Sequence, residues 1–194
     1  MRTQRIKHIH IEAGHNDNDP GASAHGYVEA EEAKKDKDYL IRALSFQLQH
    51  RTDIKIISDL DSENLSQTIS RFKKTAKKED ALISLHYNAV DNQNVRGVEV
   101  WVKENASKKE IDLANQICET YSKMLQIPNR GVKFEQNNRW KRLGILHTGA
   151  GLSILVEIDF ISHPDAIKKV EEMRERSHIA NATILINALD KNND

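Results

Sequence analysis

The spacing of apolar and polar residues changes several times along the chain, and each change marks the boundary of an expected element. Residues 6–11 alternate apolar and polar side chains, which is the period of a half-buried strand. Residues 29–49 instead place Leu40, Leu44 and Leu48 on one helix face, with charged residues opposite. Further strands are expected at 54–57, 81–86, 97–102 and 152–158. Further helices are expected at 62–78, 107–125 and 178–189, and another helix could begin with Pro164 in its first turn.

Two long segments have neither period, and we predict loops there, at 16–27 and 129–141. Strands and helices alternate along the rest of the chain. This order predicts an α/β fold with a twisted, mostly parallel or mixed central sheet and helices on both faces. A length of 194 residues suits a single domain. We therefore expect residues 1–190 to form that domain and residues 191–194 to be a frayed tail.

The charges of the chain balance, with 29 lysines and arginines against 29 aspartates and glutamates. This balance leaves no net field to attract nucleic acid or an anionic membrane. No segment approaches the roughly 20 apolar residues that cross a bilayer, so we expect no membrane insertion. Residues 1–8 are basic without the apolar run of a secretory signal, so we expect no signal peptide. The one cysteine, Cys118, shares a helical face with Ile111, Ala114 and Leu125, and we expect a buried thiol.

Two histidines lie where expected strands run out into loops. His15 follows the first strand and His86 ends the third. Strand ends are where α/β folds commonly place their sites, so the two imidazoles could converge on one ion. With Glu29 they would supply the three protein ligands that zinc takes in a hydrolytic site, which leaves Glu157 free to act as a base. The chain has nine histidines, however, and periodicity alone does not choose among them.

Four sequence blocks carry a resemblance to a known family. They are IHIEAGH (9–15) with DPGA (19–22), then Glu29, then SLHYNA (84–89) with GVEV (97–100), and LGIL (143–146) leading to LVEIDFIS (155–162). In these blocks the chain resembles the zinc-dependent N-acetylmuramoyl-L-alanine amidases found among bacterial cell-wall amidases and phage endolysins. The resemblance spans most of the chain, and four blocks in register make coincidence improbable.

The resemblance implies one zinc ion per chain and four site residues, namely the ligands His15, Glu29 and His86 and the catalytic glutamate Glu157. Glu31 and Glu32 lie close enough to the same junction of loop and helix to replace Glu29, although the distance from His15 favours Glu29. Two of these three glutamates are then expected to belong to an acidic first turn that faces water.

The chain also departs from the family pattern without losing any of these residues. The departures are at 16–17, where glycines are common, at Leu152, where proline is usual, and at Asp159 and His163, which replace glycine and asparagine. They bear on the shape of the substrate cleft rather than on the reaction. Glu12 falls where the family often has aspartate, and it could orient a ligand histidine through its second nitrogen. A plain charge at a strand end explains Glu12 equally well.

Several residues are candidates for contacts with the substrate. Arg142 and His147 flank the segment before the last expected strand, and either could contact a stem-peptide carboxylate or the oxyanion of the reaction. The basic and aromatic cluster around Trp140 could stack on sugar or peptide, although a solvated loop with one packed tryptophan is commoner. We expect Trp101 in the core, and His25 could gate the cleft.

The function implied by the resemblance is zinc-dependent hydrolysis of the amide bond between the lactyl group of N-acetylmuramic acid and L-alanine in peptidoglycan. We expect a monomer without a separate wall-binding domain, serving as a phage or prophage endolysin that stays in the cytoplasm until lysis or a partner pore releases it. A zinc carboxypeptidase or other metallopeptidase is one alternative, but such enzymes typically have a glutamate very soon after the first histidine. A non-catalytic peptidoglycan-binding module is the other, although a binder would not need Glu157.

Overall fold

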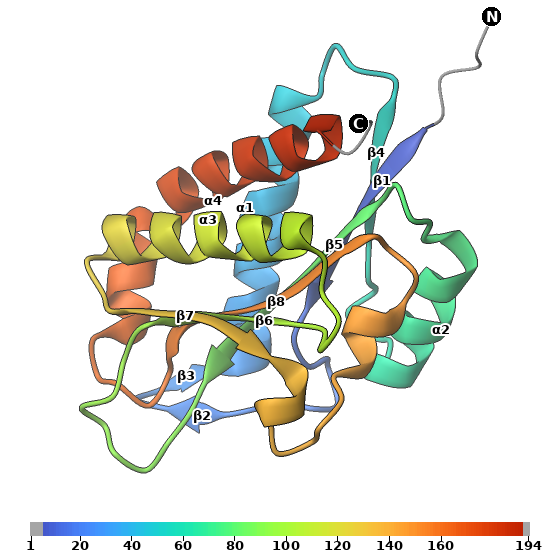
Figure 1. The fold of residues 1–194 in the computed structure, drawn as a ribbon. Helices are drawn as coiled ribbons and strands as arrows, with labels where there is room; N and C mark the ends of the chain where they lie inside the picture. Colours follow the sequence, from blue (N-terminus) through green and yellow to red (C-terminus); the bar gives the residue numbers. More distant parts are fainter. Residues whose placement is uncertain (1–5, 192–194) are drawn as a thin grey trace, which may run out of the picture.

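Six strands form one mixed sheet in the computed structural model, which describes residues 6–191. Their order across the sheet is β4-β1-β5-β8-β6-β7 (Figure 1). The strands are β1 (Lys7–Ala13), β4 (Ile54–Ser58), β5 (Ala81–Asn88), β6 (Val98–Val102), β7 (Asn129–Phe134) and β8 (Leu152–Phe160), and a separate short hairpin consists of β2 (Ser23–Ala24) and β3 (Tyr27–Val28). β4, β1, β5 and β8 run parallel, whereas β6 is antiparallel to β8 and parallel to β7.

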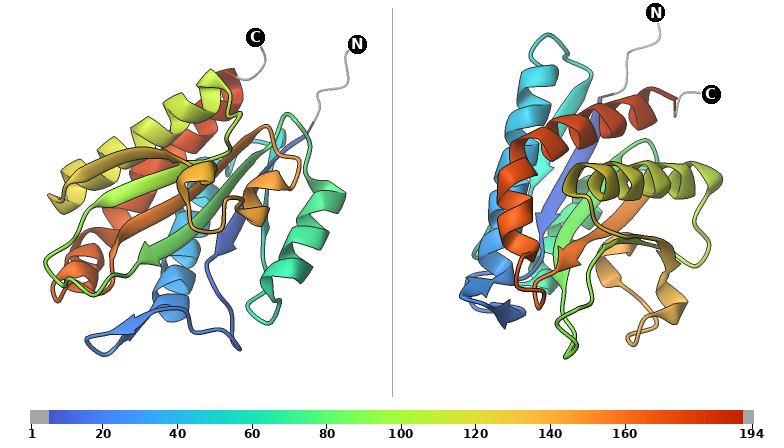
Figure 2. Two further views of the ribbon diagram at one scale, coloured as in Figure 1. Left: turned by 60° about the horizontal axis from the view of Figure 1, so that its bottom comes forward. Right: turned by 90° about the vertical axis from the view of Figure 1, so that its left-hand side faces the viewer.

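Helices cover both faces of this sheet. They are α1 (Glu29–Gln47), α2 (Leu65–Thr75), α3 (Lys108–Leu125) and α4 (Ala166–Asp190), with the short 3-10 helices η1 (Glu135–Asn137) and η2 (Gly144–His147). α1, α3 and α4 pack together on one face, while α2 and η2 cover part of the other (Figure 2). The expected fold class is confirmed: a single α/β domain with a mixed, mostly parallel sheet and helices on both faces.

The central strands β5 and β8 bury runs of consecutive residues, because apolar layers cover both of their faces. The larger core lies under α1, α3 and α4, and it includes Cys118, whose thiol pKa burial raises to about 12. The smaller core lies between the sheet and α2 and includes Leu82 and Leu155. Side chains alternate along a strand, so His86 and Glu157 continue this second face towards the C-terminal edge of the sheet.

Capping boxes fix the starts of two helices. Ser107 and Glu110 exchange hydrogen bonds at the start of α3, as the sequence predicts. Asn64 and Gln67 form a second box at the start of α2. α2 therefore covers Leu65–Thr75 rather than the longer span 62–78 that the periodicity predicts.

The predicted loop at 129–141 is wrong in its first part, where residues 129–134 form β7. β7 lies at the edge of the sheet, where no side chain is fully buried, so its sequence lacks the apolar alternation of a core strand. Gly131 has a φ of 77°, and the register with β6 shifts near it, which is the signature of a bulge.

The separate helix expected from His178 is also wrong, because α4 is continuous from Ala166 to Asp190. The apolar periodicity breaks where polar side chains are buried in the middle of α4. Arg174, Ser177, His178 and Asn181 are all at most 5% exposed. Arg174 and His178 bind carboxylates of α1 there, so a polar contact between helices replaces the apolar one that the pattern requires.

Of the expected tail at 191–194, only residue 191 is among the described residues, directly after α4. Asp190 pairs with Arg51 at 2.8 Å, and the backbone carbonyl of Lys191 accepts a hydrogen bond from Lys109 Nζ at 2.9 Å. Residues 192–194 of that tail, and residues 1–5 of the basic start, lie outside the described residues.

Candidate active site

A cleft of about 1370 Å³ opens where β1, β5 and β8 end. These strands are parallel, so their carboxyl ends meet at one edge, as is usual for sites in α/β sheets. The loop after β1 and the start of α1 line one part of the cleft, and the first turn of α2 and residues 137–140, 142 and 143 line another. Its floor includes Trp101 of β6 together with Leu155 and Glu157 of β8.

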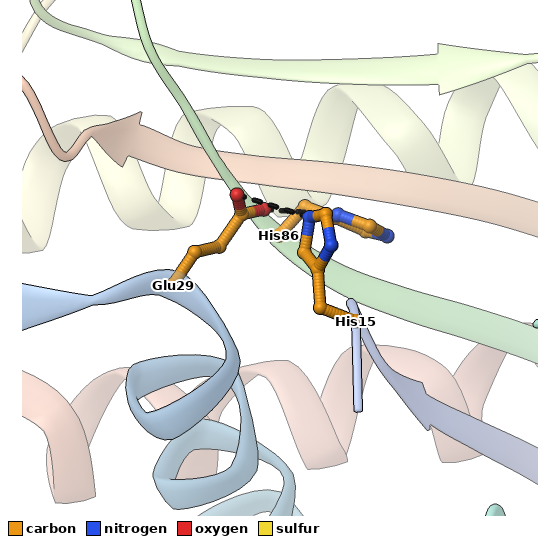
Figure 3. Close-up of side chains that lie close together, drawn as sticks. All are labelled: His15, Glu29 and His86. Carbon is orange, nitrogen blue, oxygen red and sulfur yellow. Dashed lines mark hydrogen bonds and ion pairs between the residues drawn. The ribbon is translucent and has the colours of Figure 1, made fainter. Parts of the chain in front are cut away.

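Three of the expected site residues come together in this cleft. His15 follows β1, Glu29 is the first residue of α1, and His86 lies near the end of β5 (Figure 3). Each offers one ligand atom, and these atoms all lie within 4.8 Å of one another. His15 Nε2 is 3.0 Å from Glu29 Oε2, and His86 Nδ1 is 3.1 Å from Glu29 Oε1. Two imidazole nitrogens and a carboxylate oxygen are donors that suit a zinc ion.

The backbone fixes the orientation of the Glu29 carboxylate. Ala22 N donates to Glu29 Oε2 at 3.0 Å, and Tyr87 N donates to Oε1 at 3.1 Å. Burial would raise the pKa of Glu29, but the hydrogen bonds and charges of the two histidines outweigh it and hold that pKa well below its usual range. Glu29 is therefore an anion at neutral pH in the metal-free protein.

The two rival glutamates of α1 lie elsewhere. Glu31 is exposed to water, as expected for an acidic first turn. Glu32 is 1% exposed and binds Arg174 of α4 at 2.5 Å, so the expectation that it faces water is wrong. The structure places Glu29, and neither Glu31 nor Glu32, beside the two histidines.

Two glycines let the chain approach these side chains closely. A Cβ on Gly14 would lie 2.3 Å from His86 Nδ1. A Cβ on Gly21 would lie 2.7 Å from both His15 Nε2 and Glu29 Oε2. Side chains at these positions would fill the space around the three ligand atoms, so the glycines keep room for an ion.

Two further carboxylates approach the outer nitrogens of the histidines. Asp19 Oδ2 is 3.0 Å from His15 Nδ1. Glu12 Oε2 is 3.9 Å from His86 Nε2, beyond hydrogen-bond distance, and accepts a hydrogen bond from Ser84 Oγ. Glu12 is a candidate for this role from the sequence, whereas Asp19 was not predicted. The available signal was an acidic residue four positions after a candidate ligand histidine, since such ligands usually bind a carboxylate through their second nitrogen.

Glu157 lies beside His86 in the sheet, because the two residues are register partners of β8 and β5. Its side chain is half-buried, and its Oε2 has no hydrogen-bond partner among the described residues. Burial raises the pKa of Glu157 to about 7, and the charges of Glu29 and Glu99 raise it further, while the two histidines, His86 more than His15, act in the opposite direction. This carboxylate can therefore exchange a proton near neutral pH.

The remaining candidates are more dispersed. Arg142 is exposed and lines the cleft. His147 Nε2 instead lies 2.9 Å from the carboxylate of Glu135 and is not among the residues that line the cleft. His25 bonds the Ser162 carbonyl at 2.9 Å, also away from the cleft lining. Trp101 packs beside the smaller core, as expected, but it also lines the cleft floor.

Similarity to known proteins agrees with this geometry. The "Probable cell wall amidase LytH" of Staphylococcus epidermidis is 26% identical over 184 residues, covering 92% of this chain and 56% of the relative. The chain thus spans about half the length of the curated relatives it matches.

Solved structures share the fold. The catalytic domain of CwlV, an N-acetylmuramoyl-L-alanine amidase from Bacillus (Paenibacillus) polymyxa var. colistinus, superposes with a TM-score of 0.77 at 17% identity, covering 95% of this chain and 99% of that one. The amidase AmiC2 of Nostoc punctiforme superposes with a TM-score of 0.74 at 20% identity, covering 95% and 97%. At these identities the likeness establishes the fold alone.

Within the described part of the chain, no helix has both the length and the apolar character needed to span a membrane. The family model Amidase_3, described as N-acetylmuramoyl-L-alanine amidase, matches residues 9–188, which is nearly the whole chain and includes every candidate ligand and Glu157. The chain therefore belongs to the Amidase_3 family of N-acetylmuramoyl-L-alanine amidases.

Proposed function

We propose that this chain is a zinc-dependent N-acetylmuramoyl-L-alanine amidase that hydrolyses the amide bond between the lactyl group of N-acetylmuramic acid and L-alanine of the peptidoglycan stem peptide. The observation that carries this proposal is the approach of His15, Glu29 and His86 to within 4.8 Å, in a cleft that Glu157 also lines. Membership of the amidase family supports the choice of substrate.

We assign the metal to Nε2 of His15, Nδ1 of His86 and a carboxylate oxygen of Glu29, because these are the atoms that face one another. When bound, zinc lowers the pKa of a coordinated water to about 7 and polarises a carbonyl group. The protein holds the ligands ready for it. Backbone N–H groups orient Glu29. Asp19 would accept a hydrogen bond from the Nδ1–H of His15, so that Nε2 of this ring carries the lone pair that binds the metal.

We assign the proton transfers to Glu157. Its unpartnered Oε2 would accept a proton from the attacking water, and the resulting acid would return it to the departing amine of L-alanine. Both steps require a carboxyl group that exchanges protons near neutral pH, and the raised pKa of about 7 supports this assignment. Such proton transfer typically contributes about 10²- to 10⁴-fold to a rate.

We propose that Arg142 contacts the substrate, because it lines the cleft and forms no ion pair among the described residues. A free guanidinium can bind a carboxylate of the stem peptide through two parallel hydrogen bonds. The contribution of His147 would be indirect, because its ring binds Glu135, and Glu135 also accepts the Leu143 N–H at 2.8 Å. The role of Glu12 would likewise be to support His86 rather than to touch the substrate.

Mass spectrometry of digested peptidoglycan tests this function. Zinc-loaded protein should release stem peptides with a new free amine on L-alanine, while chelated protein and His86→Ala should not. Cleavage elsewhere in the peptide would point to the metallopeptidase alternative. Binding to intact sacculi without release, by protein that contains zinc, would point to a non-catalytic wall-binding module.

A peptidoglycan substrate implies action on the cell wall, and the family includes enzymes of that kind. Use as a phage or prophage endolysin, release from the cytoplasm and a monomeric state stay predictions. Lysis of cells after co-expression with a membrane-permeabilising protein, compared with expression alone, would test the first two.

A further inference from the structure

Trp140 lines the cleft although the proposed chemistry does not use it. A packed tryptophan is the commoner expectation at this position, but the Trp140 side chain is 66% exposed. An exposed aromatic side chain on the wall of a cleft is suited to contact a ligand, because its face is apolar and its edge is polar.

A tight turn presents the Trp140 ring. Lys141 N donates to the Asn138 carbonyl at 2.9 Å, and Trp140 N donates to Asn138 Oδ1 at 3.0 Å. Lys141 adopts a left-handed φ of 60° that completes the turn. The Arg139 guanidinium lies 4.8 Å from the centre of the Trp140 ring. This cation–π contact limits the rotation of the ring and leaves the rest of its surface for another partner.

A buried carboxylate holds this turn against the body of the protein. Glu135 is 4% exposed and lies before the turn in the sequence. It accepts the Leu143 N–H at 2.8 Å and lies 2.9 Å from His147 Nε2. The Glu135 side chain thus connects the two ends of the segment that carries Trp140, and this contact fixes the position of the cleft wall.

Apolar side chains also line the cleft, among polar ones such as Asn138 and Arg139 of the same turn as Trp140. Trp101, Leu143, Ile145 and Leu155 line the cleft and also belong to or pack against the smaller core. Leu65, at the start of α2, lines the cleft with a side chain that is 52% exposed. We call these apolar residues, together with Trp140, the aromatic part of the cleft.

The cleft also presents amide side chains. Asn16 and Asn18 of the loop after β1, and Asn88 at the end of β5, line it near the candidate metal ligands. Amide side chains of this kind can both donate to and accept from a peptide. The cleft therefore offers both apolar surface for the face of a ring and amide groups for a peptide.

We propose that the aromatic part of the cleft is a subsite for the glycan strand, in which a sugar ring of the peptidoglycan stacks on Trp140. The inference rests on the proposed function, because it assigns the sugar side of the same substrate. A pyranose ring presents C–H groups on its faces, which pack on an aromatic surface, and carries its polar groups around the edge. The stem peptide presents amides and carboxylates, which suit the asparagines and Arg142.

The first test compares two substrates that share the scissile amide. One is a soluble peptidoglycan fragment that retains several disaccharide units, and the other is a synthetic lactoyl peptide without sugar. Trp140→Ala should lower kcat/KM on the glycan-linked substrate by about tenfold, mainly through KM, and leave the lactoyl peptide unchanged. Trp140→Phe should recover most of the loss. Phe46→Ala, at an exposed aromatic of α1 that does not line the cleft, is the matched control and should alter neither rate.

Equal losses on both substrates, or no loss on either, would overturn the subsite. A wild-type enzyme that cleaves neither substrate would instead count against the proposed function. A second assay decides the subsite without turnover. The chain has two tryptophans, so titration with an N-acetylglucosamine tetramer should change the fluorescence of wild type and Trp101→Phe, and any change in Trp140→Ala should need an about tenfold higher concentration. An unchanged midpoint in Trp140→Ala, or no change in any of the three proteins, would overturn the inference.

Discussion

Gly21 lies against the side chains of two proposed metal ligands, His15 and Glu29. Its φ is 66°, and a Cβ would lie 2.7 Å from His15 Nε2 and from Glu29 Oε2. We predict that Gly21→Ala costs about 1 kcal/mol in free energy of unfolding, because an L side chain is strained at this φ. The new methyl group should also separate the ligand atoms and lower zinc affinity by about 10- to 100-fold. Competition with a chelator of known affinity measures this loss.

Gly26 provides the matched control for this substitution. Its φ of 83° is also left-handed, but a Cβ there would meet nothing within 4 Å. Gly26→Ala should therefore lose a similar amount of stability and keep its zinc affinity. An equal loss of affinity in the two variants would mean that strain in the loop, rather than crowding of the ligands, controls the site.

At the scale of single residues, the sequence predicted those side chains that a motif marks. Spacing favoured Glu29 over Glu31 and Glu32, and Glu29 is the one that lies beside the histidines. That these residues bind zinc stays a prediction. Asp19 and Trp140 could not be assigned, because their roles depend on a loop conformation and on a turn held by a distant carboxylate.

At the scale of elements, the contact between α1 and α4 holds the helix that begins at Glu29. Arg174 of α4 binds Glu32 at 2.5 Å and Asp36 at 3.0 Å, and all three side chains are buried. Asp36 also accepts a hydrogen bond from the Tyr87 hydroxyl, and the backbone N–H of Tyr87 donates to Glu29. The helix contact is thus linked through Tyr87 to the candidate site.

We predict that Arg174→Met destabilises the protein by about 3–5 kcal/mol, because it removes the guanidinium that pairs with both buried carboxylates and leaves them only the basic side chains of Lys35 and His178. Arg176→Met, at an exposed position of the same helix, should stay within about 0.5 kcal/mol of wild type. Urea unfolding followed by circular dichroism measures both variants. If the two variants lost similar free energies of unfolding, the buried ion pairs of Arg174 would contribute no more to stability than an exposed arginine.

The same contact explains which elements could be predicted from the sequence. α1 and α3 have regular apolar faces or capping signals, and both were predicted nearly to their ends. The middle of α4 was missed because its buried residues are polar and satisfied by α1, which no pattern within α4 reveals. β7 was missed because an edge strand depends on pairing with β6 rather than on burial of its own side chains.

At the scale of the whole molecule, the acidic and basic groups of the cleft make the stability of the metal-free protein depend on pH. Burial raises the pKa of both Glu12 and Glu157 to about 7. Burial would lower the pKa of His86, but Glu29, Glu12 and Glu157 together raise it to about 9. Each group binds its proton more tightly in the folded state than in the unfolded state. Its stabilisation is complete below its unfolded pKa and is lost as pH rises through its folded pKa.

We therefore predict that the free energy of unfolding of metal-free protein falls by a few kcal/mol between about pH 5 and about pH 9. The lowered pKa of Glu29 changes the free energy of unfolding only at pH values below the ordinary pKa of a glutamate, so it does not reverse this trend. Zinc binding should release protons, because ligands must be deprotonated, and calorimetry in buffers of different ionisation enthalpy would count them. Stability that rises with pH across this window would contradict the pKa directions.

The most direct test of the account is Glu157→Gln, assayed for both metal and product. This substitution keeps the size of the side chain and removes its ability to carry a proton. Zinc content measured by mass spectrometry should remain one ion per chain, while release of stem peptides with a free L-alanine amine should fall at least about 100-fold. Near-normal release by the zinc-loaded variant, or loss of zinc together with activity, would contradict the roles proposed for Glu157 and the three ligands.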